Sequence, residues 1–129
     1  MQAHYSIEPD RRHGMIRVTM AGFYNQDDIA AFVAALREGL IKLGTAPNGH
    51  IMLCDVRGMK IQTQEIVAAF GNVVGSPLLR SKRLAFVTGS SLSRLQTRRL
   101  TTRRGVEFFG DLASAEKWLL EPSAQSIAA

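Results

Sequence analysis

The four residues Asp55-Val56-Arg57-Gly58 carry the most informative side-chain chemistry in the chain. They close an apolar run that begins at Ile51, and the loops after buried parallel strands are frequent ligand sites. The planar fork of Arg57 suits a small anion or the carboxylate of a partner. The alternative is a surface arginine that pairs with Asp55. Asp55, Arg57 and Gly58 are therefore candidate binding residues.

A second candidate site is the turn Thr88-Gly89-Ser90-Ser91, which follows another short apolar run and opens a basic helix. Free N–H groups at a helix start attract phosphate or carboxylate. The alternative is ordinary N-capping by Ser90 or Ser91. If the two apolar runs form neighbouring strands, this turn and Arg57 lie at the same edge of the sheet, and all four turn residues are candidate ligand contacts.

The region between Glu65 and Glu107 contains no acid but half of the 16 lysines and arginines of the chain. Helical spacing places Arg99 near one face with Leu92 and Leu95, so its stem is expected to lie over the sheet. Such a region suits a negatively charged ligand or partner, or else a solvated basic surface. Nucleic-acid binding is the weakest of these interpretations, because no aromatic platform accompanies the charges. The basic residues are Arg80, Lys82, Arg83, Arg94, Arg98, Arg99, Arg103 and Arg104.

Enzymatic chemistry is poorly supported by the sequence. Cys54 lies inside the apolar run, where a thiol is usually inert. The three histidines lack metal-ligand spacing. Asp27 and Asp28 are better explained as acids at a helix start than as a catalytic pair. We therefore expect no enzyme activity, no cofactor and no metal.

Alternating and helical periodicities predict an α/β fold with a mixed, mostly parallel five-stranded sheet in the order β-β-α-β-α-β-α-β-α. The first strand is expected to be an antiparallel edge, because a short turn joins it to the second. Strands are expected over residues 4–10, 15–20, 51–56, 84–87 and 106–109. Helices are expected between the caps Asn25 and Gly44, between Thr63 and Gly75, from residue 92 to about 103, and after Asp111.

Composition fits one soluble domain, expected over residues 4–121, followed by a flexible tail over residues 122–129. The chain has 129 residues, 46% of them hydrophobic, and no apolar run long enough to span a membrane. Because the N-terminus also lacks a signal-peptide pattern, the expected compartment is the cytoplasm. The runs 51–56 and 84–87 are apolar on both faces, so the second face needs the last helix, a homodimer partner or an apolar ligand as cover.

Several stretches together resemble the SpoIIAA-like branch of the STAS domains, the sulphate-transporter and anti-sigma-factor-antagonist family, including its small stand-alone STAS/SEC14-type members. They are the strand 15–22 ending in glycine, the helix start Asn25-Gln26-Asp27-Asp28, the segment Asp55-Val56-Arg57-Gly58, and the closing segment with Ala115, Trp118 and Leu119. The resemblance spans residues 5–120.

The resemblance implies a non-catalytic regulatory or ligand-binding domain that binds a protein partner or a small anion. Anti-sigma antagonists have a phosphorylatable serine where this chain has Arg57, so we expect no phosphorylation switch here. The SEC14-type likeness makes a lipid or other apolar anionic ligand the second hypothesis. Nucleic-acid binding through the basic helix is the third.

Overall fold

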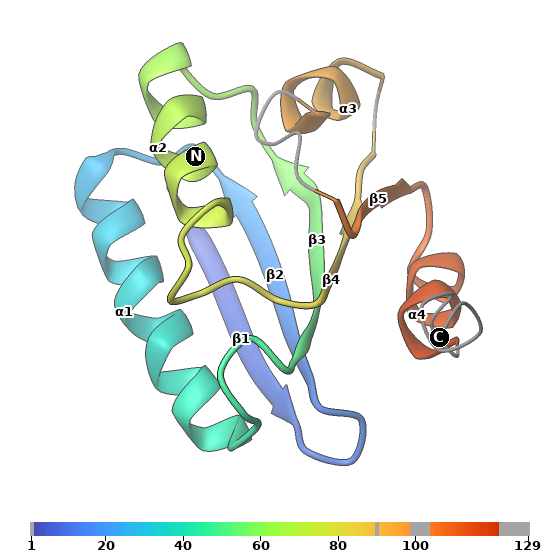
Figure 1. Cartoon of the computed structure of the whole chain (residues 1–129). Helices are drawn as coiled ribbons and strands as arrows, with labels where there is room; N and C mark the ends of the chain where they lie inside the picture. Colours follow the sequence, from blue (N-terminus) through green and yellow to red (C-terminus); the bar gives the residue numbers. More distant parts are fainter. Residues whose placement is uncertain (1, 90, 99–103, 122–129) are drawn as a thin grey trace.

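The computed structural model describes residues 2–89, 91–98 and 104–121 and contains one five-stranded sheet with four helices (Figure 1). The predicted fold class and element order are confirmed. The strands are β1 (His4–Asp10), β2 (Met15–Gly22), β3 (Ile51–Met59), β4 (Arg83–Val87) and β5 (Val106–Phe109). The helices are α1 (Gln26–Leu43), α2 (Gln64–Val74), α3 (Ser91–Arg98) and α4 (Leu112–Leu120).

The strands lie in the order β1-β2-β3-β4-β5. The β1–β2 pair is antiparallel and the other three pairs are parallel, as expected. Two sequence predictions need correction or restriction. β3 continues to Met59, so Asp55, Arg57 and Gly58 belong to the end of a strand rather than to a loop, because β2 still pairs with this segment. The predicted helix from 92 to about 103 is seen as Ser91–Arg98, and its remainder lies outside the described residues.

The first helix begins and ends as its cap residues predict. The Asn25 side chain accepts a hydrogen bond from the Asp28 backbone N–H at 2.8 Å, and the Asp28 carboxylate accepts the Asn25 N–H at 2.9 Å. This reciprocal arrangement satisfies two free donors at the helix start. Gly44 ends the helix with a left-handed φ of 74°, a conformation that glycine adopts without a steric penalty.

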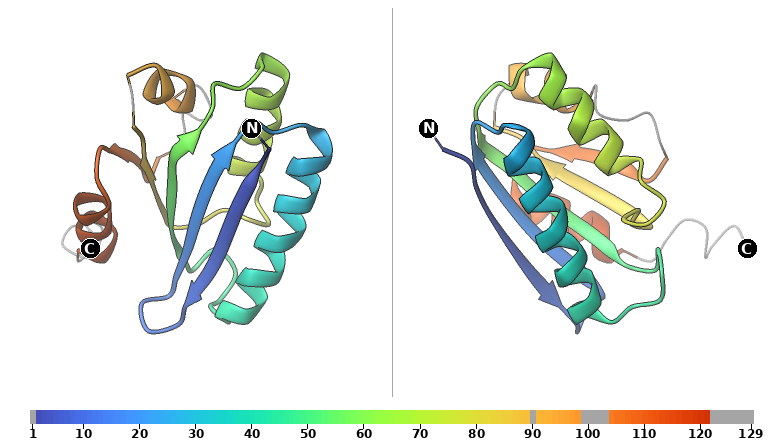
Figure 2. Two further views of the ribbon diagram at one scale, coloured as in Figure 1. Left: turned by 180° about the vertical axis from the view of Figure 1, so that it is seen from behind. Right: turned by 90° about the vertical axis from the view of Figure 1, so that its left-hand side faces the viewer.

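One sheet face carries the main core under α1 and α2, and the other packs against α4 (Figure 2). Alternation along β3 explains this division, since successive side chains point to opposite faces. Met52, Cys54 and Val56 join the main core. Ile51 and Leu53 join the smaller cluster with residues of α4.

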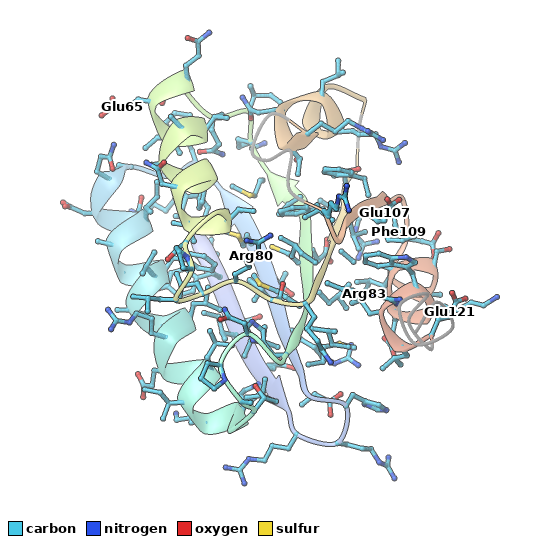
Figure 3. The ribbon with its side chains drawn as sticks, in the orientation of Figure 1. Glu65, Arg80, Arg83, Glu107, Phe109 and Glu121 are labelled. Carbon is cyan, nitrogen blue, oxygen red and sulfur yellow. The ribbon has the colours of Figure 1, made fainter. Side chains whose placement is uncertain are left out.

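Helix α4 provides the cover that the second face required. Ala115 and Leu119 are 0% and 3% exposed within the smaller cluster. The Arg83 guanidinium lies 5.1 Å from the Trp118 ring centroid and donates a hydrogen bond to the Trp118 carbonyl oxygen at 2.6 Å. Figure 3 shows Arg83 beside this helix. The Ala-x-x-Trp-Leu segment is thus the docking face of α4.

Candidate functional site

The carboxyl ends of the parallel strands bring the two predicted sites together. β3 and β4 are paired neighbours, so the end of β3 and the turn after β4 share one edge of the sheet. A methyl group placed on Gly89 would lie 3.5 Å from the Arg57 carbonyl oxygen. A methyl group on Gly58 would lie 2.9 Å from the Ala21 Cβ, so glycine allows β2 and β3 to approach closely there.

Arg57 forms a bidentate ion pair with Asp55. Its Nε donates to Asp55 Oδ1 at 3.0 Å and its Nη2 donates to Asp55 Oδ2 at 2.9 Å. The Arg57 backbone N–H adds a third bond to Oδ1 at 3.1 Å. The side chains are 42% and 14% exposed respectively. The alternative weighed from the sequence, an arginine paired with Asp55, therefore describes the geometry.

The pKa of Asp55 reflects two opposed effects. Burial is the largest and raises the pKa, but the side-chain and backbone hydrogen bonds from Arg57 and its positive charge together outweigh burial. The net pKa of Asp55 lies below its ordinary value. Arg57 also acts on Asp111 at the start of α4: hydrogen bonds from Ser114 lower the Asp111 pKa most, and the Arg57 charge lowers it further.

The structure describes only some of the other predicted site residues. Thr88 is buried, its backbone N–H donates to the Phe109 carbonyl oxygen at 2.9 Å, and its hydroxyl accepts a bond from Arg94 Nε at 3.5 Å. Ser91 begins α3, although its side chain lies outside the described part of the structure. Ser90 and Arg99 lie outside the described residues altogether.

Gln62 is a structural centre of this edge that the sequence did not reveal. Its side-chain oxygen accepts the Tyr24 N–H at 2.9 Å, and its side-chain nitrogen donates to the Gly22 carbonyl oxygen at 3.0 Å. Its backbone exchanges two hydrogen bonds with the Gln96 side chain, at 2.8 and 2.9 Å. These bonds join the segments after β2 and β3 to α3. These three partners are distant in sequence, so no local pattern indicated them.

Large exposed apolar side chains follow the carboxyl ends of four adjacent strands. Each stands in the segment after β2, β3, β4 or β5, and all are 39% exposed or more. In Figure 1 the arrowheads of β2 and β3 point toward α3 and the start of α2, which marks this edge. We call these residues the edge patch: Phe23, Ile61, Leu95 and Leu112.

An apolar groove lies between α2 and the sheet face formed by β3 and β4, and one end of it reaches Gln62 and Gln96, the sequence neighbours of Ile61 and Leu95. It has a volume of about 80 Å³, with Val67, Phe70 and Val73 of α2 along one wall. Cys54 and Phe86 form part of its floor. We call it the α2 groove. Sequence periodicity predicted its apolar residues as core but gave no indication that they leave a space.

Among the described residues, no group of three or more His, Cys, Asp or Glu side chains is arranged to hold a metal ion. No helix in this part of the chain has the length and apolarity needed to cross a membrane. The described arginines of α3 are engaged within the molecule: Arg94 with Thr88, and Arg98 over the Phe108 ring at 4.7 Å from its centroid.

Comparison with solved structures identifies the fold. An uncharacterised DUF3478-family protein with a SpoIIAA-like fold, from Shewanella loihica PV-4, matches with a TM-score of 0.61 and 18% identity, over 91% of this chain and 93% of that one. An anti-sigma factor antagonist from Mycobacterium paratuberculosis matches with a TM-score of 0.60 and 14% identity, over 93% and 96%. No family model and no curated protein sequence matches the chain.

The chain therefore has the SpoIIAA-like fold, which places it structurally among proteins such as anti-sigma factor antagonists. The resemblance read from the sequence is confirmed at the level of the fold. At these identities the likeness describes architecture, so the function has to be argued from the edge patch, the Asp55–Arg57 pair and the α2 groove.

Proposed function

We propose that the protein is a non-catalytic regulatory domain that binds a protein partner through the carboxyl-end edge of its sheet. The observation that supports this most strongly is the edge patch, in which four exposed apolar side chains follow adjacent strand ends at the sheet edge that also holds the Asp55–Arg57 ion pair. Apolar side chains beside an ordered arginine are typical of binding hot spots. The matched anti-sigma factor antagonist is a fold neighbour that acts on another protein, as its name states.

The Asp55–Arg57 ion pair favours contact with a protein partner over binding of a free anion. Because the Asp55 carboxylate occupies the Nε–Nη2 edge of the Arg57 guanidinium, an anion that binds this edge would have to compete with a carboxylate already in place. A partner that contacts the remaining exposed surface does not face that competition. Arg57 also keeps its charge at physiological pH, so it supplies a permanent contact rather than a phosphorylation switch.

Two remaining expectations belong to the same proposal. The cytoplasm is the expected compartment, and a homodimer stays a prediction for solution measurement. The third sequence hypothesis, nucleic-acid binding, receives less support, because the described α3 arginines contact Thr88 and Phe108. The second hypothesis, an apolar anionic ligand, is favoured by a separate observation, the α2 groove.

Affinity capture from the native cell tests the proposed partner surface. The tagged protein is compared with an Ile61→Ser/Leu95→Ser variant and with Ile41→Ser, whose isoleucine is 80% exposed on α1 and outside the edge patch. We expect one near-stoichiometric protein partner, lost from the double variant and retained by the control. Equal recovery from both variants, or no near-stoichiometric partner with the unchanged protein, would contradict the proposal.

A further inference from the structure

The α2 groove has the properties of a small-molecule site, and its lining contains none of the four edge-patch residues. Its lining is mostly apolar and comes from α2, β3, β4 and the segments that flank them. Val73 and Val74 of α2 remain half-buried although they pack against the main core. We propose that the groove binds a short apolar monocarboxylate of about four to eight carbons.

The volume of the groove sets the size of the ligand. An engineered apolar cavity of about 150 Å³ accepts benzene, which has six carbons. The α2 groove has a volume of about 80 Å³, which holds roughly three or four carbon atoms. Further carbons would lie along the half-buried valines of α2. A long lipid chain does not fit this space, so the groove narrows the earlier lipid hypothesis to a short acid.

The charged residues that line the groove indicate that its ligand is negatively charged. Lys60 and Arg80 both line it, and the described lining contains no acid. Neither forms a salt bridge with a described residue. Lys60 follows β3 and Arg80 precedes the parallel strand β4, so they stand at opposite ends of the groove. A short acid therefore meets one of them and not both.

Arg80 is the better partner for the carboxylate. Its guanidinium matches a carboxylate with two parallel hydrogen bonds, which a lysine ammonium cannot do. Figure 3 shows Arg80 on the connection between α2 and β4, in front of the sheet. The Asn48 side chain fixes this connection by donating to the Arg80 carbonyl oxygen at 2.7 Å and to the Pro77 carbonyl oxygen at 2.9 Å. The guanidinium thus stands on an anchored backbone.

The polar side chains Gln62 and Cys54 in the groove lining offer no free hydrogen-bonding group to a ligand, so the ligand tail is expected to be apolar. The Gln62 side chain is already bonded to Tyr24, Gly22 and Lys60. Cys54 is 2% exposed, and burial raises the pKa of its thiol to about 12, so it stays neutral. An additional polar group on the ligand tail would lose its water without gaining a free partner here.

A chain-length series on the isotope-labelled protein tests the proposal. Backbone amide NMR shifts are followed during titration with straight-chain acids from butyrate to hexadecanoate, and with the alcohol of each matching length. We expect saturable shifts in α2, β3 and β4, tightest between four and eight carbons, with the acid bound about tenfold more tightly than its alcohol. Steadily increasing affinity up to hexadecanoate, or no saturable shift with any acid, would overturn the proposal.

Matched variants test the position of the ligand. Val73→Phe should fill the groove and abolish binding, whereas Val33→Phe on α1 adds the same bulk to a half-buried valine outside the groove and should leave binding intact. If Val73→Phe does not fold, Val67→Phe blocks the same wall. Unchanged binding by a folded blocking variant would overturn the site.

A charge variant tests the role of Arg80. Arg80→Gln should remove the preference for acid over alcohol, so that both bind equally. Arg12→Gln, in the turn between β1 and β2, removes the same charge far from the groove and should keep the tenfold preference. A preference that survives in Arg80→Gln would overturn the assignment of the carboxylate to Arg80. Because these measurements use a defined acid and no partner, their failure would leave the partner surface untouched.

Discussion

Replacing Leu53 by alanine tests whether α4 seals the second face of the sheet. Leu53 is 3% exposed and packs in the smaller cluster with Ala85, Ala115 and Leu119. The substitution removes three buried carbons, worth roughly 2.4 kcal/mol at about 0.8 kcal/mol each. An unfilled cavity raises the total for such substitutions to as much as about 5 kcal/mol. Because the nine-residue helix α4 can shift toward the void, we expect a loss of about 3 kcal/mol.

Urea unfolding followed by circular dichroism measures this loss directly, and thermal unfolding checks it. For 129 residues the unfolding entropy is about 0.27 kcal/mol per kelvin, so 3 kcal/mol lowers the melting temperature by about 11 °C. Leu78→Ala is the control, because Leu78 is 80% exposed and should change stability by less than about 0.5 kcal/mol.

A loss below about 0.5 kcal/mol for Leu53→Ala would refute the packing of α4 on this face. Any homodimer raises the unfolding midpoint as the protein concentration increases. Because the described part of α4 already buries Ala115 and Leu119, the loss caused by Leu53→Ala should be the same at every protein concentration. A loss that changes with concentration would show that a second copy contributes to the cover.

Three further predictions follow from local geometry. Asn25→Ala should cost about 0.5–2 kcal/mol in urea unfolding, because it removes the side-chain oxygen that accepts the Asp28 backbone N–H in the α1 capping box. The pKa of Asp55, followed by carbon NMR, should lie below the ordinary aspartate value. Its ion pair therefore stabilises the fold above the unfolded-state pKa, and this stabilisation is lost as pH falls through the folded pKa. In Arg57→Gln the pKa of Asp55 should rise relative to the unchanged protein, because the side-chain hydrogen bonds and the positive charge are lost while burial and the backbone N–H bond remain; an unchanged midpoint would refute this. Cys54 should react with iodoacetamide at pH 8 roughly 10³ times more slowly than the unfolded chain, in a mass-spectrometric time course, and rapid native labelling would contradict its burial.

The fold was largely predictable because its signals are local. Asn25, Thr63 and Asp111 each cap the helix that the sequence assigned to them. The alternation in β2 and the apolar run of β3 set which side chains face each helix layer. The end of β3 was predicted too early, because its last residues are held by pairing with β2 rather than by their own hydrophobicity.

The sequence predicted the parts of the site that follow from the order of the strands, but not the parts that depend on long-range side-chain contacts. The parallel neighbours β3 and β4 brought Arg57 and Gly89 together as expected. The hydrogen bonds of Gln62 to Tyr24, Gly22 and Gln96 were not foreseeable, because they join residues 34 to 40 positions apart. The α2 groove was equally hidden, since periodicity predicts that valines face a core but not that the core leaves a space among them.

Site-specific photo-crosslinking in the native cell tests the proposed partner surface most directly. A photoreactive amino acid is placed at Leu95 in the edge patch and, in a second strain, at Ile41 on the exposed face of α1. The proposed function predicts a covalent adduct with one protein at Leu95 and none at Ile41. Adducts of equal yield at both positions, or the absence of any adduct at Leu95, would contradict it.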